Sequence, residues 1–144
     1  MGLDMYLSKK RFIGGDERKQ LKISGIEPPV DIAKVECIVE EAAYWRKANA
    51  IHRWFVINVQ CNRDECACFD VSREQLAALL DVVEQVQADH AKAAELLPTQ
   101  NGFFFGSVEY DAAYFFDLAE TRRMLSAALR EDEPDTAFVY QASW

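Results

Sequence analysis

The sequence has no long apolar run. Its uncharged stretches 56–62 and 96–108 are far shorter than the roughly 20 apolar residues that a membrane-spanning helix needs. Half of the residues are hydrophobic and 28% are charged, which is the balance of a folded globular protein and excludes a disordered or fibrous chain. At 144 residues the chain is long enough to bury one core and too short for two. We therefore predict a single domain, residues 1–144, with no membrane element.

An export signal is also missing. The first residues lack a basic segment and a long apolar segment, and Tyr6 stands where a myristoylation motif has Ser or Thr. The four cysteines, Cys37, Cys61, Cys66 and Cys68, could form two disulfides in a secreted protein. Without a signal, we expect free thiols and a cytoplasmic location.

Common catalytic and metal-binding motifs are absent as well. The chain has no Gly-x-x-x-x-Gly-Lys phosphate loop, no Gly-x-Gly-x-x-Gly dinucleotide turn and no Gly-x-Ser-x-Gly hydrolase elbow. Cys66 and Cys68 are one residue apart and no second close pair accompanies them, which disfavours a structural zinc site. We predict no cofactor and no metal, and enzymes of these motif classes are disfavoured.

Positive charge is scarce in the second part of the chain. Residues 1–60 carry ten Lys/Arg against eight Asp/Glu, whereas residues 61–144 carry six against sixteen. The two parts therefore have net charges of +2 and −10, and a nucleic-acid partner is disfavoured because polyphosphate would be repelled. The carboxylates either keep the protein soluble or attract a basic surface of a partner protein.

Alternating apolar residues mark a strand at each end of the chain. Leu3, Met5 and Leu7 alternate with more polar residues near the start, and residues 138–144 do the same at the end. We expect these two strands to pair in one sheet. The glycines and prolines of residues 9–29 predict a turn or hairpin excursion, with a short strand over 21–24.

Apolar residues spaced three and four apart predict three helices between the strands. They cover about 42–59, 72–97 and 111–130, and Ser72 with Gln75 forms a capping box at the start of the second. Residues 31–43 fit a strand or a helix equally well, and 60–70 read as a loop that leads into a brief strand. The predicted fold is α+β, a small sheet with about three helices on one face.

The first candidate site is the helix predicted over residues 42–59. On a helix Trp45, Asn49 and His52 share a strip beside the buried face, while Arg46 and Arg53 point outward. This strip either lines a groove, in which His52 exchanges protons and the arginines hold an anion, or consists of edge residues that hydrogen-bond to crossing loops.

The second candidate site is the segment between the second and third helices. Its three consecutive phenylalanines lie between Gly102 and Gly106, so they either form a buried strand or the floor of a pocket. In the pocket interpretation the polar groups at the mouth are those of Gln100, Asn101, Ser107, Glu109 and Asp111.

Three blocks resemble a family of small uncharacterised proteins that are often encoded by phages and prophages. The blocks are residues 1–7 (MGLDMYL), residues 44–52 (YWRKANAIH) and residues 96–111, which contain LLPTQNGFFFGS followed by EYD. The resemblance spans nearly the whole chain and brings no assigned activity with it. It implies a phage accessory protein that binds a host protein.

These observations lead to a functional hypothesis and two alternatives. The hypothesis is a non-enzymatic binding or regulatory module that acts on a host protein through the two candidate segments. The first alternative is a small enzyme or anionic-ligand binder in which His52 works with Asn49, Arg46 and Gln100. The second is a homodimer, formed if the apolar seam of residues 76–97 pairs with its copy.

Overall fold

A computed structural model describes residues 2–130 and 133–144 of the chain. Its four strands form one antiparallel sheet in the order β2-β1-β4-β3. The strands are β1 (Asp4–Phe12), β2 (Cys37–Arg46), β3 (Phe69–Val71) and β4 (Thr136–Ser143). The helices are α1 (Gly15–Arg18), α2 (Asn49–Asn58), α3 (Arg73–Ala88), α4 (Ala93–Leu96) and α5 (Ala112–Arg130). The sequence of residues 131–135 (EDEPD) predicts an acidic end to the third helix, and two of these residues, 131 and 132, lie outside the described part of the chain, as does Met1.

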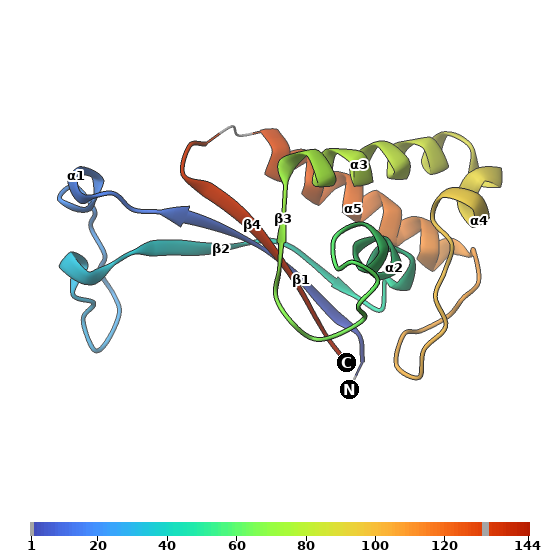
Figure 1. The fold of residues 1–144 in the computed structure, drawn as a ribbon, viewed down its shortest axis with the longest axis horizontal. Helices are drawn as coiled ribbons and strands as arrows, with labels where there is room; N and C mark the ends of the chain where they lie inside the picture. The colour runs from blue at the N-terminus through green and yellow to red at the C-terminus, as the bar shows by residue number, and fades with distance from the viewer. Residues whose placement is uncertain (1, 131–132) are drawn as a thin grey trace.

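The two terminal strands pair in the middle of the sheet, as predicted. Met5 lies opposite Ala142 and Leu7 lies opposite Tyr140. All four of these side chains are buried, because alternate residues of each strand point to the same face of the sheet. The two ends of the chain consequently lie close together (Figure 1).

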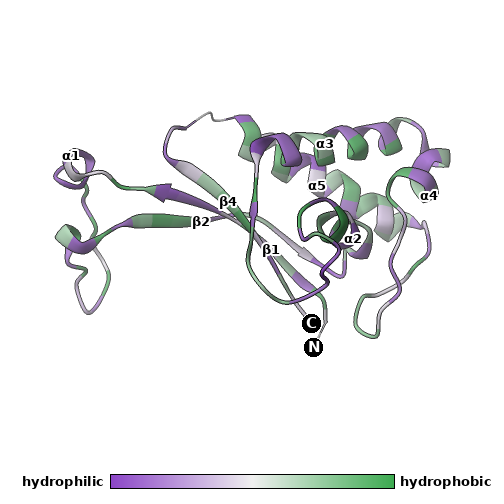
Figure 2. Cartoon of the chain, viewed as in Figure 1, coloured by the Kyte–Doolittle hydropathy of each residue, from purple (hydrophilic) through white to green (hydrophobic). Residues whose placement is uncertain are grey.

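The three longer helices, α2, α3 and α5, lie on one face of the sheet (Figure 1), which confirms the α+β prediction. Apolar and polar residues alternate along α3 and α5 in Figure 2, as expected for helices with one buried face. The two helices pack against each other, and α5 also contacts β2. In the described chain no helix is both long and apolar enough to cross a membrane.

The prediction of a helix over 42–59 was wrong for its first part. Residues 37–46 form β2, and the helix begins only at Asn49. β2 pairs with β1 along its whole length, and Ala43 and Trp45 point into the core while the residues after each point to solvent. Lys47 then adopts a left-handed conformation with φ 57°, which separates the strand from the helix. The open question about residues 31–43 is answered by a 3-10 turn at Ile32–Lys34 followed by the strand.

The helix predicted over 72–97 is interrupted. It starts with the predicted capping box of Ser72 and Gln75 and ends at Ala88, because Asp89 is extended and its carboxylate accepts a hydrogen bond from the N–H of Ala91. The apolar seam of α3 is buried in the monomer, where α5 packs against it. The homodimer alternative required this seam to be uncovered. Since α5 covers it on α3, that requirement is not met there.

The turn-rich segment after β1 leads away from the helices (Figure 1). It contains the short helix α1 and the 3-10 turn, and β1 itself extends to Phe12. The strand expected over 21–24 does not form, because these residues have no strand pairing in the structure. The brief strand expected after the loop at 60–70 is β3.

Candidate functional site

Asn49, the first residue of α2, holds the segment between α4 and α5 in place. Its side-chain oxygen accepts a hydrogen bond from the main-chain N–H of Gln100 at 3.0 Å. Its side-chain nitrogen donates to the carbonyl oxygens of Phe105 at 2.9 Å and Ser107 at 2.8 Å. Asn49 is buried and the bond to Phe105 is buried with it, so the three bonds together fix the position of the segment on α2.

His52 lies one turn further along α2 and is completely buried, with 0% of its surface exposed. Its Nε2 lies 2.8 Å from a carboxylate oxygen of Asp64, and its Nδ1 lies 2.7 Å from the hydroxyl of Tyr140. An ionised carboxylate can only accept, so Nε2 carries the proton and the Tyr140 hydroxyl donates to Nδ1. The other carboxylate oxygen of Asp64 accepts from the side-chain nitrogen of Gln100 at 2.8 Å.

The neutral imidazole is favoured at this position. Burial lowers the pKa of His52, and the hydrogen bond to Asp64 opposes that shift without reversing it. Burial also raises the pKa of Tyr140 well above its ordinary value, which keeps the phenol protonated and able to donate. The rings of Phe105 and Trp144 cover the imidazole edge to face, at 5.4 and 5.6 Å. Both ring nitrogens are engaged, so His52 joins three segments of the fold and presents no nitrogen to a substrate.

Trp45 belongs to a different part of the molecule from Asn49 and His52. It lies on β2, and its indole N–H donates to the hydroxyl of Thr121 on α5 at 2.8 Å. That hydroxyl in turn donates to the main-chain carbonyl of Asp117 at 2.6 Å. The predicted strip of three residues on one helix therefore does not exist. Asn49 and His52 instead match the alternative in which edge residues hydrogen-bond to crossing loops.

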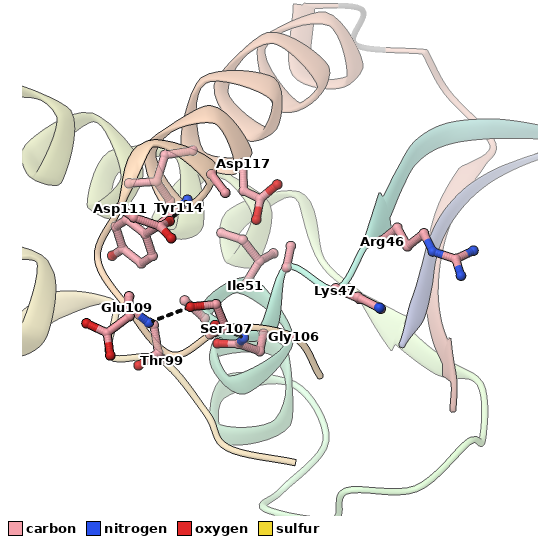
Figure 3. Close-up of a pocket in the computed structure, with 15 residues that line it drawn as sticks. Arg46, Lys47, Ile51, Thr99, Gly106, Ser107, Glu109, Asp111, Tyr114 and Asp117 are labelled. Carbon is pink, nitrogen blue, oxygen red and sulfur yellow. Dashed lines mark hydrogen bonds between the residues drawn. The ribbon is translucent and has the colours of Figure 1, made fainter. Parts of the chain in front are cut away.

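A cavity of about 250 Å³ lies beside Asn49, between the first turn of α2, the segment that follows α4 and the start of α5. We call it the Asp117 cavity. Its charged lining residues are Arg46, Lys47, Glu109, Asp111 and Asp117. In Figure 3 Asp111 and Asp117 face the cavity, whereas the guanidinium of Arg46 points away from it. Arg46 instead lies 3.5 Å from the carboxylate of Asp4.

Asp117 is the distinctive group in this cavity. It is half-buried, yet in residues 2–130 and 133–144 its carboxylate has neither a hydrogen-bond nor an ion-pair partner. Burial, with a smaller effect from the negative charge of Asp111, raises the pKa of Asp117 to about 6. A carboxylate in this situation is stabilised by any cation that enters the cavity.

Sequence reasoning missed Asp117 because the chain is rich in carboxylates. A signal was nevertheless present, since Asp117 stands three residues after Tyr114 and four before Thr121, both of which belong to the buried stripe of α5. Residues at these spacings share one side of a helix, so this carboxylate had to lie at the edge of the core.

The structure distributes the ten predicted site residues over several places. Arg46, Asn49, Ser107, Glu109 and Asp111 line the Asp117 cavity. His52 and Gln100 belong to the buried hydrogen-bond network, Trp45 bonds to Thr121, Arg53 lines a second cavity and Asn101 is exposed. Of the phenylalanines, Phe105 is buried beside His52 whereas Phe103 is 95% exposed, so the segment is a turn rather than a buried strand.

Comparison with known proteins does not assign the chain to a family. No protein-family model, no curated protein and no solved structure matches it. The functional interpretation therefore depends on the geometry alone, and the resemblance to phage-encoded proteins stays a prediction.

The polar side chains that line the Asp117 cavity include the hydroxyl of Ser107. The hydroxyl of Ser107 accepts a hydrogen bond from the N–H of Glu109 at 3.1 Å (Figure 3). Within the described chain its hydroxyl makes no bond to an imidazole or a carboxylate that could activate it as a nucleophile. Over the same residues, no three His, Cys, Asp or Glu side chains are grouped so that they could hold a metal ion.

Proposed function

We propose that the protein is a non-catalytic binding module that receives a lysine or arginine side chain of a protein partner in the Asp117 cavity. The observation that carries this proposal is the half-buried carboxylate of Asp117, which has no partner in the described chain. Removing a carboxylate from water costs free energy unless an opposite charge or hydrogen-bond donors replace the water. An ammonium or guanidinium group would supply both.

The charges around the cavity favour the same type of ligand. Asp111 and Glu109 line it together with Asp117, and the cationic residues of the lining, Arg46 and Lys47, come from the other side (Figure 3). The residues that follow position 60 carry most of the negative charge of the chain. A basic segment would therefore be steered toward this part of the molecule by long-range attraction as well as by the cavity itself.

The size of the cavity favours a side chain over a free metabolite. Pockets for small molecules usually enclose about 300–1,000 Å³, and the Asp117 cavity has about 250 Å³. The segment that forms its rim also exposes Phe103, Val108 and Tyr110. Exposed aromatic and apolar side chains beside a charged cavity are typical of a protein interface.

The resemblance to phage-encoded proteins would make the partner a bacterial host protein. The alternative of an enzyme that uses His52 as acid or base receives less support. His52 is fully buried and both of its ring nitrogens are hydrogen-bonded. A catalytic base has to reach the proton that it moves, directly or through one water.

A binding experiment with a matched pair of variants tests the proposal. The probe is a short lysine-rich peptide, and its affinity is measured by calorimetry at low ionic strength for the wild type, Asp117→Asn and Asp70→Asn. Asp70 is an exposed carboxylate on β3, so both substitutions remove one negative charge. We expect Asp117→Asn to weaken binding by about tenfold or more and Asp70→Asn to have a much smaller effect. Equal losses would show that only the net charge matters, and an absence of binding to the wild type would also contradict the proposal.

A further inference from the structure

A second cavity, of about 380 Å³, lies where α2 meets the segment that ends α4. We call it the Arg53 cavity. Its lining residues are Ala50, Arg53, Trp54, Ile57, Asn58, Glu95, Leu96, Leu97 and Pro98. Ala50 is the one residue that it shares with the Asp117 cavity, so the two have different walls and different charge.

Arg53 is a cation without a counter-charge. Among residues 2–130 and 133–144 its guanidinium forms no hydrogen bond and no ion pair, and its Nε is buried without an acceptor. Other arginines of the chain are better satisfied: Arg73 donates to the carbonyl of Leu129, and Arg123 pairs with Glu120. A buried N–H without an acceptor destabilises the folded protein. Arg53 is therefore a place where an added acceptor would stabilise the protein.

Apolar side chains form part of the walls around Arg53. Trp54, Ile57, Leu96, Leu97 and Pro98 supply them, and the indole of Trp54 is packed edge to face against Phe55 at 5.5 Å. The single carboxylate in the lining, Glu95, is exposed and does not pair with Arg53. The cavity thus combines an unpaired guanidinium, which can bind an anion, with apolar side chains that can contact a hydrophobic group.

We infer that the Arg53 cavity binds a small organic anion, a carboxylate joined to an aromatic or aliphatic body. The carboxylate accepts from the guanidinium of Arg53, which presents a planar fork of donors that suits two carboxylate oxygens. The body of the ligand lies against Trp54 and Pro98, where burial of its apolar surface adds affinity. The volume of about 380 Å³ fits this class, because small-molecule pockets enclose about 300–1,000 Å³.

This site is independent of the proposed partner site. A basic side chain would be repelled by Arg53, and an organic anion would be repelled by the carboxylates of the Asp117 cavity. Asp117→Asn is therefore expected to leave binding at Arg53 unchanged, so that failure of one proposal does not entail failure of the other.

The test is an NMR titration of the full chain with 3-phenylpropionate and, separately, with its neutral analogue 3-phenylpropionamide. We expect the acid to shift the backbone N–H signals of residues 53–58 and 95–98 in a saturable way. The neutral analogue should bind at least about tenfold more weakly than the acid. Arg53→Gln should lower affinity for the acid to that of the amide. Arg123→Gln, which removes an exposed and paired arginine, should leave it unchanged.

Three results would overturn the inference. They are equal affinity for the acid and the amide, shifts that map away from α2, and an unchanged affinity in Arg53→Gln. The comparison of acid with amide uses only the wild-type protein, so the test does not depend on whether the variant folds. The amide spectrum and thermal melting curve of Arg53→Gln show separately whether its structure is intact.

Discussion

The side-chain oxygen of Asn49 accepts a hydrogen bond from the main-chain N–H of Gln100 at 3.0 Å, which joins the first turn of α2 to a segment 51 residues further along the chain. The same amide group donates to two carbonyls of that segment. One buried side chain therefore satisfies three main-chain groups of that segment. The shape of the Asp117 cavity depends on this arrangement, because Asn49 and its partner Ser107 both line it.

Replacing Asn49 by Ala should destabilise the protein strongly. Three main-chain groups would lose their partner and a buried side chain would be removed, so we expect a loss of about 2–4 kcal/mol in the free energy of unfolding. Urea denaturation measures it. Asn58→Ala is the matched control, since Asn58 is exposed and its side chain makes a single bond to the carbonyl of Trp54. A cost for Asn49→Ala no greater than that for Asn58→Ala would refute the role assigned to Asn49.

His52 should make the protein less stable as the solution becomes acidic. Burial lowers its pKa in the folded chain, so below the ordinary value of 6.5 the unfolded chain binds a proton that the folded chain does not. Asp64 and Tyr140, the groups that face the ring, are expected to keep their hydrogen bonds in this range. Stability should fall as the pH drops below about 6.5, by up to about 1.4 kcal/mol per pH unit.

The measurement is urea denaturation at several pH values, with and without His52. In His52→Gln this part of the pH dependence should disappear, whereas His90→Gln, which removes an exposed imidazole, should retain it. If His52→Gln proves too unstable to study, imidazole NMR signals of the wild type report the same property. A pKa of His52 in the folded protein that is not below its ordinary value of 6.5 would contradict the prediction.

Asp117→Asn should stabilise the protein near neutral pH while it weakens binding of a basic peptide. The pKa of Asp117 is raised to about 6 by burial, with Asp111 adding to the shift, so the charged form is unfavourable in the folded state. Stability of the wild type should therefore fall as pH rises through about 4 to 6. Glu109, Arg46 and Lys47 are the other charged groups that line the cavity.

At pH 7 the variant is expected to be more stable by about 1–2 kcal/mol, a figure reduced from the full shift because Asp117 is partly exposed to solvent. Thermal melting of Asp117→Asn and Asp70→Asn at pH 4 and pH 7 gives the comparison. If Asp117→Asn raises the stability of the fold and also weakens peptide binding, Asp117 serves binding rather than folding. If Asp117→Asn is less stable than the wild type at pH 7, the carboxylate has a stabilising partner in the folded protein, which would contradict the prediction.

Gly102→Ala should disturb the segment that carries the cavity rim. A Cβ at this position would lie 2.6 Å from a ring carbon of Phe105, and this ring is packed in the core beside His52. We expect a loss of about 1–3 kcal/mol, because the ring can move only by disturbing its neighbours. Gly15→Ala is the control, since nothing lies within 4 Å of its Cβ position. Equal melting temperatures for the two variants would show that Phe105 has room to shift.

The order of the elements could be predicted from the sequence alone wherever the decisive contacts are local. The stripe of α5 and the capping box of α3 depend on residues three and four apart, and both formed as expected. The alternation of Leu3, Met5 and Leu7 likewise marked β1. These patterns are properties of a short stretch of chain, since the periods of helix and strand place residues on one face independently of what packs there.

Residues 42–46 show where local patterns stop being sufficient. Tyr44, Ala48 and Ile51 have helical spacing, but Ala43 and Trp45 also have strand spacing, and pairing with β1, about 40 residues away, favoured the strand. The site was decided in the same way: the bonds of Asn49 to Gln100, and the missing partners of Asp117 and Arg53, are relations between distant segments. The sequence by itself determined which residues could be buried and in what local geometry. Only the tertiary structure decided which polar groups meet and which are left unpaired, because that depends on long-range packing of the whole chain.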